Sequence, residues 1–348
     1  PIFSKLNIKY YYTIIMLNKK NILITGGTGS FGKNFVNFIL KKYKPKKIVI
    51  FSRDEQKHFK LQKIWGRHKN LRFLIGDVRD LSRLSFAMND VDIVIHAAAM
   101  KHVPQGEYNP FEVVKTNILG AQNVIEASLS QKVKKVIALS TDKASSPVNL
   151  YGATKLTSDK LFVAANNYKG KKDIKFSVVR YGNVLGSEGS ILPFFLKCKK
   201  QNLFPITDKR MTRFNITLEE SVKFVIFCLN KMWGGELFVP KIPSFKVIDL
   251  ANSISIKPKF KIIGIRPGEK LHEEMISESE ALNTIIYKNH FVVTPSSDYL
   301  HWNKNKYFKN FPGGRFCPEN YTYNSLINKD YLSIKKIKKI IQNFPKDF

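Results

Sequence analysis

Cysteine is scarce in this sequence, which has three cysteines in 348 residues: Cys198, Cys228 and Cys317. Three widely separated thiols do not form a disulfide framework or a cysteine-rich metal cluster, so we expect no metal site and a reducing, cytoplasmic compartment. Long apolar runs are also missing, because no stretch reaches the roughly 20 residues that a membrane-spanning helix needs. These absences favour a protein without a membrane partner, a bound metal or structural disulfides.

Acidic residues are few: 27 Asp and Glu stand against 58 Lys and Arg, which gives a net charge of +31. Basic surfaces attract phosphate polymers, so a nucleic-acid binder is one hypothesis. The basic residues are spread over the whole chain, however, and no nucleic-acid-binding motif accompanies them. We therefore expect no nucleic-acid partner, although the charge favours an anionic substrate.

Short apolar segments alternate with helix-like segments through the first half of the chain. Each apolar segment has the length of a strand, and the intervening segments have helical spacing, as in 111–129. Buried parallel strands separated by helices indicate an α/β fold, a doubly wound parallel sheet of the Rossmann type. The expected strands are 21–25, 47–51, 71–75, 92–97, 135–140 and 176–180.

The alternation stops near Gly186, after which prolines separate shorter elements. We expect residues 1–15 to be an extension outside the fold, because Met16 leads directly into the first strand. Residues 16–185 then form the dinucleotide-binding domain and 186–295 mainly a smaller substrate-binding lobe, part of which returns to the sheet. Residues 296–348 form a tail.

A glycine-rich loop follows the first expected strand. Gly26, Gly29 and Gly32 lie between that strand and the next helix. Glycines allow a tight turn and a close approach of the backbone to a pyrophosphate, whose charge then lies at the helix N-terminus. This position predicts a dinucleotide cofactor.

The end of the second strand bears on which dinucleotide binds. A carboxylate there holds the ribose hydroxyls of NAD, whereas a cation accommodates the 2′-phosphate of NADP. The sequence has Ser52, Arg53 and Asp54 in succession. Arg53 and Ser52 favour NADP, and Asp54 leaves NAD possible.

Tyr151 and Lys155 form a Tyr-x-x-x-Lys pair on an expected helix, so both side chains project from one face. A phenol needs help to act as a base near neutral pH, and a nearby ammonium stabilises the phenolate. The preceding strand ends in Ser140, Thr141, Asp142 and Lys143. The pattern predicts a tyrosine that acts as a catalytic base with the help of the lysine.

These motifs together resemble the extended short-chain dehydrogenase/reductases, and more closely the inverting UDP-N-acetylglucosamine 4,6-dehydratases that begin pseudaminic acid synthesis for surface or flagellar glycans. The similarity extends from about Met16 to Pro295. It is carried by the glycine loop and by the stretches 52–55, 76–80, 101–104, 107–110, 140–144, 149–155, 180–183 and 266–273.

The resemblance implies a mechanism. Tyr151, assisted by Lys155, would remove the proton of the carbon-4 hydroxyl while a hydride passes to NADP. Lys143 would then take the carbon-5 proton, Asp142 would protonate the departing carbon-6 hydroxyl, and Thr141 would bind the carbon-4 oxygen. The product would be UDP-2-acetamido-2,6-dideoxy-β-L-arabino-hex-4-ulose.

The resemblance also implies the binding residues and an assembly, which is a homo-oligomer and in this family a hexamer. The residues expected at the cofactor are Gly26, Thr28, Gly29, Ser30, Phe31, Gly32, Ser52, Arg53, Asp54, Glu55, Lys57, Asp77, Val78, Ala97, Lys101, Tyr151 and Lys155. Those expected at the UDP-N-acetylglucosamine substrate are Lys101, Thr141, Asn183, Thr207, Arg213, Arg266 and Glu269.

Two positions depart from the family pattern. Glu188 stands where arginine is usual and Asn215 where tryptophan is usual, which puts local substrate contacts in question. The alternatives within enzymes are a retaining 4,6-dehydratase and a nucleotide-sugar 4-epimerase or reductase. Retaining dehydratases commonly lack the tyrosine, and epimerases need neither Asp142 nor Lys143 for an elimination. A regulatory protein that keeps the fold without turnover is the alternative outside enzymes.

Overall fold

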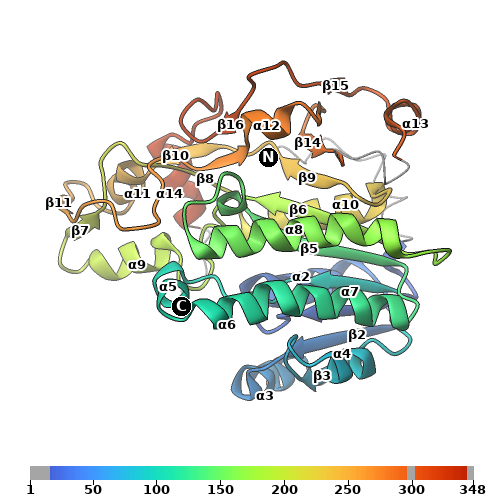
Figure 1. The fold of residues 1–348 in the computed structure, drawn as a ribbon. Coiled ribbons are helices and arrows are strands. Elements are labelled where there is room, and N and C mark those ends of the chain that lie inside the picture. The colour runs from blue at the N-terminus through green and yellow to red at the C-terminus, as the bar shows by residue number, and fades with distance from the viewer. Residues whose placement is uncertain (1–15, 296–301, 343–348) are drawn as a thin grey trace.

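One large sheet organises the chain in the computed structural model, which describes residues 16–295 and 302–342 (Figure 1). Its strand order is β15-β13-β14-β9-β6-β5-β4-β1-β2-β3. Seven neighbouring strands, from β3 to β9, are parallel, and the three at the other edge are antiparallel. The strands are β1 (Asn21–Thr25), β2 (Lys47–Ser52), β3 (Leu71–Ile75), β4 (Ile93–His96), β5 (Lys135–Thr141), β6 (Lys175–Tyr181), β9 (Leu237–Pro240), β13 (Thr284–Ile286), β14 (His290–Val293) and β15 (Arg315–Phe316).

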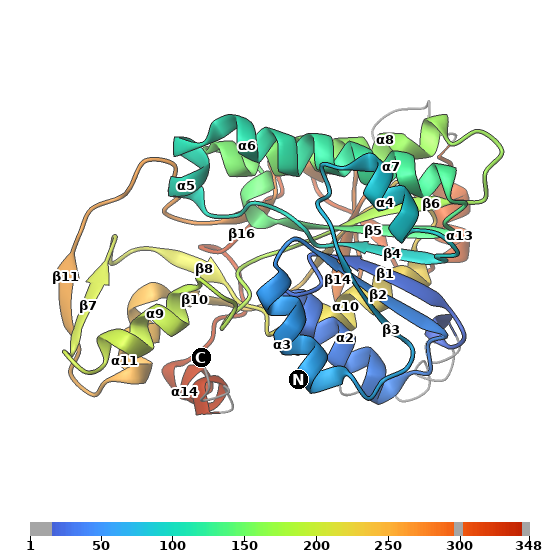
Figure 2. The ribbon, with the colours of Figure 1, turned by 90° about the horizontal axis from the view of Figure 1, so that it is seen from below.

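Helices cover both faces of this sheet, which explains why its central strands are continuous apolar runs. Every residue of β1 is buried. Figure 2 shows α7 and α8 on one side and α2, α3 and α10 on the other. The helices of this part are α2 (Ser30–Lys42), α3 (Glu55–Trp65), α4 (Leu81–Ala87), α5 (Val103–Tyr108), α6 (Pro110–Val114), α7 (Gly120–Ser130), α8 (Leu150–Tyr168) and α10 (Leu218–Lys231).

The predicted fold class is confirmed, and all six expected strands are present with ends within one residue of those expected. The helix expected over 111–129 is interrupted, because the π-helical turn η1 (Lys115–Leu119) separates α6 from α7. The side-chain amide of Asn117 in this turn accepts a 2.8 Å hydrogen bond from the Met100 N–H and donates a 2.9 Å hydrogen bond to the Met100 carbonyl. The interruption therefore fixes the loop that follows β4.

A smaller lobe with its own hydrophobic core projects from one end of the sheet (Figure 1). Phe195, Phe204 and Leu250 are buried in this core. The lobe is built from α9 (Ile191–Cys198), β7 (Leu203–Ile206), β8 (Thr212–Phe214), β10 (Ser244–Lys246), α11 (Val247–Ile254) and β11 (Lys259–Ile262). Between these segments α10 and β9 return to the main sheet, as do β13 and β14 after them.

The C-terminal segment joins both parts. It contains α13 (Lys304–Asn310), β15, β16 (Tyr323–Asn324) and α14 (Ile334–Gln342). Strand β15 extends the main sheet, β16 pairs with β12 (Glu274–Ile276) next to α12 (Glu278–Ala281), and α14 packs on α11. The expected N-terminal extension, residues 1–15, lies outside the described residues.

Candidate active site

A cavity of about 740 Å³ lies at the carboxyl ends of the parallel strands. Strands β2 and β4 flank β1 on opposite sides, so the strand order reverses here, the position at which doubly wound sheets bind their ligands. The cavity brings together most of the residues expected at the cofactor and the substrate. They are Gly26, Thr28, Gly29, Ser30, Phe31, Gly32, Ser52, Arg53, Asp54, Lys57, Val78, Ala97, Lys101, Thr141, Asp142, Lys143, Tyr151, Lys155 and Asn183.

The glycine loop is packed so closely that it accepts no side chains at two positions. Gly26 has φ +66°, and a Cβ there would lie 2.9 Å from the backbone nitrogen of Ala98. A Cβ on Gly32 would lie 2.5 Å from the Cα of Gly27. No side chain caps the N-terminus of α2 behind this loop. Its backbone N–H groups therefore suit the pyrophosphate of a dinucleotide.

The end of β2 presents a hydroxyl and a guanidinium to the cavity. The hydroxyls of Ser52 and Thr28 are hydrogen-bonded at 2.8 Å. The Arg53 side chain is 55% exposed and lies 3.5 Å from the Asp77 carboxylate. Asp54 is the N-cap of α3 and accepts a 2.9 Å hydrogen bond from the backbone of Lys57. One oxygen of the Asp54 carboxylate is therefore already hydrogen-bonded to the backbone of α3.

Glu188, in the loop after β6, contacts residues that line the part of the cavity next to the glycine loop. Its carboxylate lies 3.1 Å from Lys57 Nζ, and its backbone oxygen accepts a 2.7 Å hydrogen bond from Lys101. Its backbone N–H donates to the Ser30 hydroxyl at 3.0 Å. The hydrogen bond from Lys57 lowers the pKa of Glu188. The unusual carboxylate is therefore neutralised within the protein.

Tyr151 and Lys155 reach the cavity from the first turns of α8. Asn149 caps this helix by accepting a 2.7 Å hydrogen bond from the backbone of Gly152. Burial raises the pKa of Tyr151 to about 12, although the nearby Lys143 ammonium opposes this rise. Burial lowers the pKa of Lys155, which Asp159 one turn further along α8 partly opposes. Both side chains therefore line the cavity, and the cation that acts on the Tyr151 phenol is Lys143.

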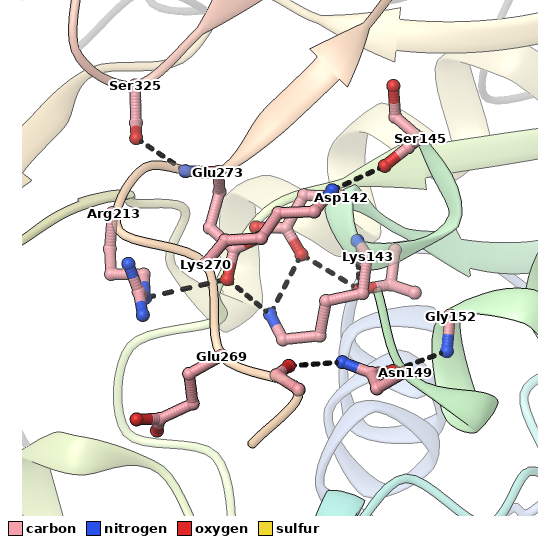
Figure 3. Close-up of polar contacts among 12 residues, drawn as sticks. Asp142, Lys143, Ser145, Asn149, Gly152, Arg213, Glu269, Lys270, Glu273 and Ser325 are labelled. Carbon is pink, nitrogen blue, oxygen red and sulfur yellow. Dashed lines mark hydrogen bonds and ion pairs between the residues drawn. The ribbon is translucent and has the colours of Figure 1, made fainter. Parts of the chain in front are cut away.

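Asp142 and Lys143 follow β5 in the short 3₁₀ turn η2 (Asp142–Ala144). Figure 3 shows Lys143 between the carboxylates of Asp142 and Glu273. Its Nζ lies 3.1 Å from Asp142 Oδ1 and 3.2 Å from Glu273 Oε1. The same Glu273 oxygen lies 3.5 Å from Arg213 Nε. Thr141 donates a 2.9 Å hydrogen bond to Asp142.

Burial and charge act differently on the three groups. Burial raises the pKa of Asp142, although Lys143 opposes it. Burial alone would lower the pKa of Lys143, but Asp142 and Glu273 outweigh it, and the pKa is raised. Burial alone would raise the pKa of Glu273, but Lys143 and Arg213 hold it below its usual value. At this turn the Lys143 ammonium therefore lies between an ionised glutamate and an aspartate whose pKa is raised.

Several expected site residues do not line this cavity: Glu55, Asp77, Thr207, Arg213, Arg266 and Glu269. Arg266 is half exposed and pairs with Glu269 at 2.7 Å. Asn149 donates a 2.7 Å hydrogen bond to the backbone of Gly268, which holds this loop against the start of α8. Sequence reasoning gave Glu273 no role, although it ends the stretch 266–273 on which the resemblance rests.

Metal binding, membrane insertion and disulfide bonding can be checked over the described residues. Within residues 16–295 and 302–342, no cluster of three or more His, Cys, Asp or Glu side chains is arranged to hold a metal. Over the same ranges the helices are too short or too polar to span a membrane. All three cysteines are free.

The doubly wound sheet, the glycine loop and the Tyr-x-x-x-Lys pair over one cavity define an extended short-chain dehydrogenase/reductase. Within that class the chain belongs to the polysaccharide biosynthesis protein family, whose model matches residues 22–295.

Two relatives and one solved structure are each similar to this chain over 94% of its length. The inverting UDP-N-acetylglucosamine 4,6-dehydratase of Campylobacter jejuni serotype O:2 is 54% identical over 94% of this chain and 99% of its own length. A UDP-glucose 4-epimerase of Rickettsia bellii is 38% identical over 94% of this chain and 97% of its own. The structure of Pen from Bacillus thuringiensis is 37% identical, with a TM-score of 0.84 over 94% of this chain and all of that one.

Proposed function

We propose that this chain is a configuration-inverting UDP-N-acetylglucosamine 4,6-dehydratase that uses NADP. One observation carries the proposal: Asp142 and Lys143 lie in the same cavity as Tyr151 and Lys155. An epimerase needs the second pair only, whereas an elimination needs an acid and a base in addition. The name and the 54% identity of the Campylobacter protein support the same reaction and substrate.

Each residue has a distinct task in this reaction. Tyr151 takes the proton of the carbon-4 hydroxyl, and the Lys155 ammonium stabilises the phenolate that results. The dinucleotide, which the glycine loop and the end of β2 would hold, would supply hydride transfer from carbon 4 and finally to carbon 6, while a proton is delivered to carbon 5. The carbon-4 ketone acidifies the carbon-5 proton, which Lys143 removes while Thr141 holds the ketone oxygen. Asp142 protonates the carbon-6 hydroxyl, which leaves as water.

The preference for NADP rests on the end of β2. Arg53 lines the cavity and is half exposed, so its guanidinium is available to a 2′-phosphate. Asp54 caps α3, which weakens the case for its binding the ribose hydroxyls of NAD. Ser52 lines the same wall and adds a hydroxyl donor. Identification of the nucleotide released from denatured protein tests this assignment directly.

Unsatisfied polar atoms support a ligand in the substrate half of the cavity. Asn183 Oδ1 and Asp142 Oδ2 are buried and have no hydrogen-bond partner among the residues that the structure describes. Such atoms are rare in folded proteins unless a ligand or water completes them. We assign Asn183 and Lys101 to the sugar nucleotide and Asp142 to the departing hydroxyl. We assign the uridine diphosphate, by family resemblance, to Thr207, Arg213, Arg266 and Glu269.

Incubation with UDP-N-acetylglucosamine in deuterium oxide tests the reaction. We expect mass spectrometry to show loss of one water and proton NMR to show deuterium at carbon 5 with the L-arabino configuration. The D-configuration would instead identify a retaining dehydratase. An unchanged mass with inversion at carbon 4 would identify a 4-epimerase, the reaction named for the Rickettsia relative.

A homo-oligomer, a cytoplasmic location and a role in pseudaminic acid synthesis remain parts of this proposal. Light scattering of the purified protein tests the first, and cell fractionation the second. Conversion of the product by the next enzymes of that synthesis tests the third.

A further inference from the structure

Glu273 is brought to the catalytic turn from the other end of the chain. It lies immediately before β12, and its backbone is fixed by Ser325, which follows β16. The Glu273 N–H donates to the Ser325 hydroxyl at 2.9 Å, and the Ser325 N–H donates to the Glu273 carbonyl at 2.7 Å. Only 2% of Glu273 is exposed. The carboxylate is therefore held rigidly where it meets Lys143.

We propose that Glu273 is a positioning residue that holds the Lys143 amine beside Asp142 and retains the single proton that the two residues share. The proposal rests on the dehydratase function proposed above, because it assigns Lys143 and Asp142 to the elimination. Glu273 itself does not line the cavity, so it acts through Lys143 rather than on the substrate.

The geometry explains why a second carboxylate is needed. Lys143 Nζ has three donors, of which Asp142 Oδ1 takes one at 3.1 Å and Glu273 Oε1 another at 3.2 Å. If the Lys143 proton passes to Asp142, the neutral amine still donates to Glu273, so it does not rotate away from the cavity. The second contact thus keeps the amine at the cavity while its lone pair turns from Asp142 toward carbon 5.

The charges around Lys143 act in both directions. Asp142 and Glu273 stabilise the ammonium, whereas Arg213 disfavours it. Lys270 lies close to both carboxylates and to Lys143, and it donates a 2.6 Å hydrogen bond to the Ser145 carbonyl. Removal of the Glu273 charge leaves the Lys143 ammonium with its contact to Asp142 and without its contact to Glu273. The pair should then lose its shared proton at lower pH.

Tyr151 also faces Lys143, so activity alone does not isolate the lysine. We therefore propose two measurements on wild type, Glu273→Gln and Glu273→Asp. The first is kcat and KM for UDP-N-acetylglucosamine against pH. The second needs no substrate: the rate at which an acylating reagent labels Lys143 against pH, read by peptide mass spectrometry. Thermal unfolding and cofactor retention show whether each variant is folded.

In Glu273→Gln we expect the alkaline decline of kcat and the midpoint of Lys143 labelling to move down by about one pH unit, since a nearby opposite charge shifts a pKa by about 1–3 units. KM should change less than kcat, because Glu273 does not line the cavity and reaches the substrate site only through its contact with Arg213. Glu273→Asp keeps the charge and should restore the wild-type pH dependence. The matched control is Glu274→Gln, whose carboxylate binds Ser145 and Ser146 instead and should leave both midpoints in place.

The outcomes separate the two proposals. A uniform loss of activity in Glu273→Gln with both midpoints unchanged would show that Glu273 is merely structural and would overturn this inference. If wild type removes no water but the labelling midpoint still shifts, the dehydratase function is wrong and the control of Lys143 by Glu273 stands. If Glu273→Gln does not fold, the comparison is made between Glu273→Asp and Glu274→Gln. Equal midpoints of Lys143 labelling in these two variants support the requirement for a charge at position 273. A lower midpoint in Glu273→Asp contradicts it.

Discussion

Gly152 sets how closely α8 approaches the catalytic turn, and replacing it with alanine tests that spacing. A Cβ at this position would lie 2.2 Å from the backbone oxygen of Lys143 and 3.1 Å from the Cβ of Pro147. Real Cβ contacts essentially never fall below 3.0 Å, so α8 and η2 must separate by at least about 0.8 Å. A misplacement of about 1 Å at a reacting group costs on the order of 10²-fold in rate. We expect Gly152→Ala to lower kcat by about that factor.

Stability distinguishes this explanation from an effect on the helix itself. Alanine is a better helix former than glycine by about 1 kcal/mol in a helix interior, so propensity alone predicts a gain. Overpacking predicts a loss of about 1–3 kcal/mol, and we expect thermal unfolding to show that loss. Ala153→Ser is the control, because it adds one atom to the same turn at an exposed position. A Gly152→Ala protein with full activity and a raised Tm would refute the reasoning.

The remaining predictions concern chemistry, cofactor and pH. Tyr151→Phe should abolish transient cofactor reduction and water loss together. Asp142→Asn should keep cofactor reduction, seen by absorbance, but slow water loss by about 10²–10⁴-fold, and equal losses of both would contradict its role as the acid. Arg53→Asp should weaken NADP by about 1.5–3 kcal/mol, measured by titration with NAD as the control; equal weakening of both would contradict its contact with the 2′-phosphate. Burial lowers the pKa of His96 and His290 to about 3, so these folded histidines stay neutral while the unfolded chain protonates near 6.5. Stability should therefore be complete above about pH 6.5 and fall below it, by about 1.4 kcal/mol per histidine and pH unit, until about pH 3. Thermal unfolding midpoints that do not change between about pH 6.5 and pH 3 would disprove the assignment of His96 and His290 as neutral in the folded protein.

The sheet was predictable because its central strands are buried on both faces and therefore read as uninterrupted apolar runs. Strand β1 is the clearest example, with all five residues of Asn21–Thr25 buried. The antiparallel edge was not predictable in the same way. Strand β15 has two residues, both exposed, and β13 has three, so neither carries a period that sequence reading detects. Strand β13 is placed by pairing with β14, and β15 by pairing with β13, rather than by local sequence.

The site was predictable where its residues are contiguous in motifs and not where they meet through the fold. The spacing of Tyr151 and Lys155 on one helix indicates chemistry, and the resemblance to the family supplies the roles of Asp142 and Lys143 a few residues earlier. Glu273 reaches Lys143 because it precedes β12, which pairs with β16 and packs against η2. The contacts of the 266–273 stretch with the catalytic turn could not be predicted, since no local pattern encodes a tertiary ion pair.

The Asp142–Lys143 pair carries the right number of protons for an elimination without help from solvent. The reaction needs a neutral amine and a protonated carboxyl, and the ion pair differs from that state only by transfer of one proton across 3.1 Å. Burial raises the pKa of Asp142, which brings the two arrangements closer in energy. When Lys143 takes the carbon-5 proton and Asp142 gives its own to the departing hydroxyl, the ammonium and carboxylate are restored. On this account the two residues act as one unit, so the double variant Asp142→Asn with Lys143→Ala should be little slower than the worse single variant. Fully additive losses would show that the acid and the base work independently.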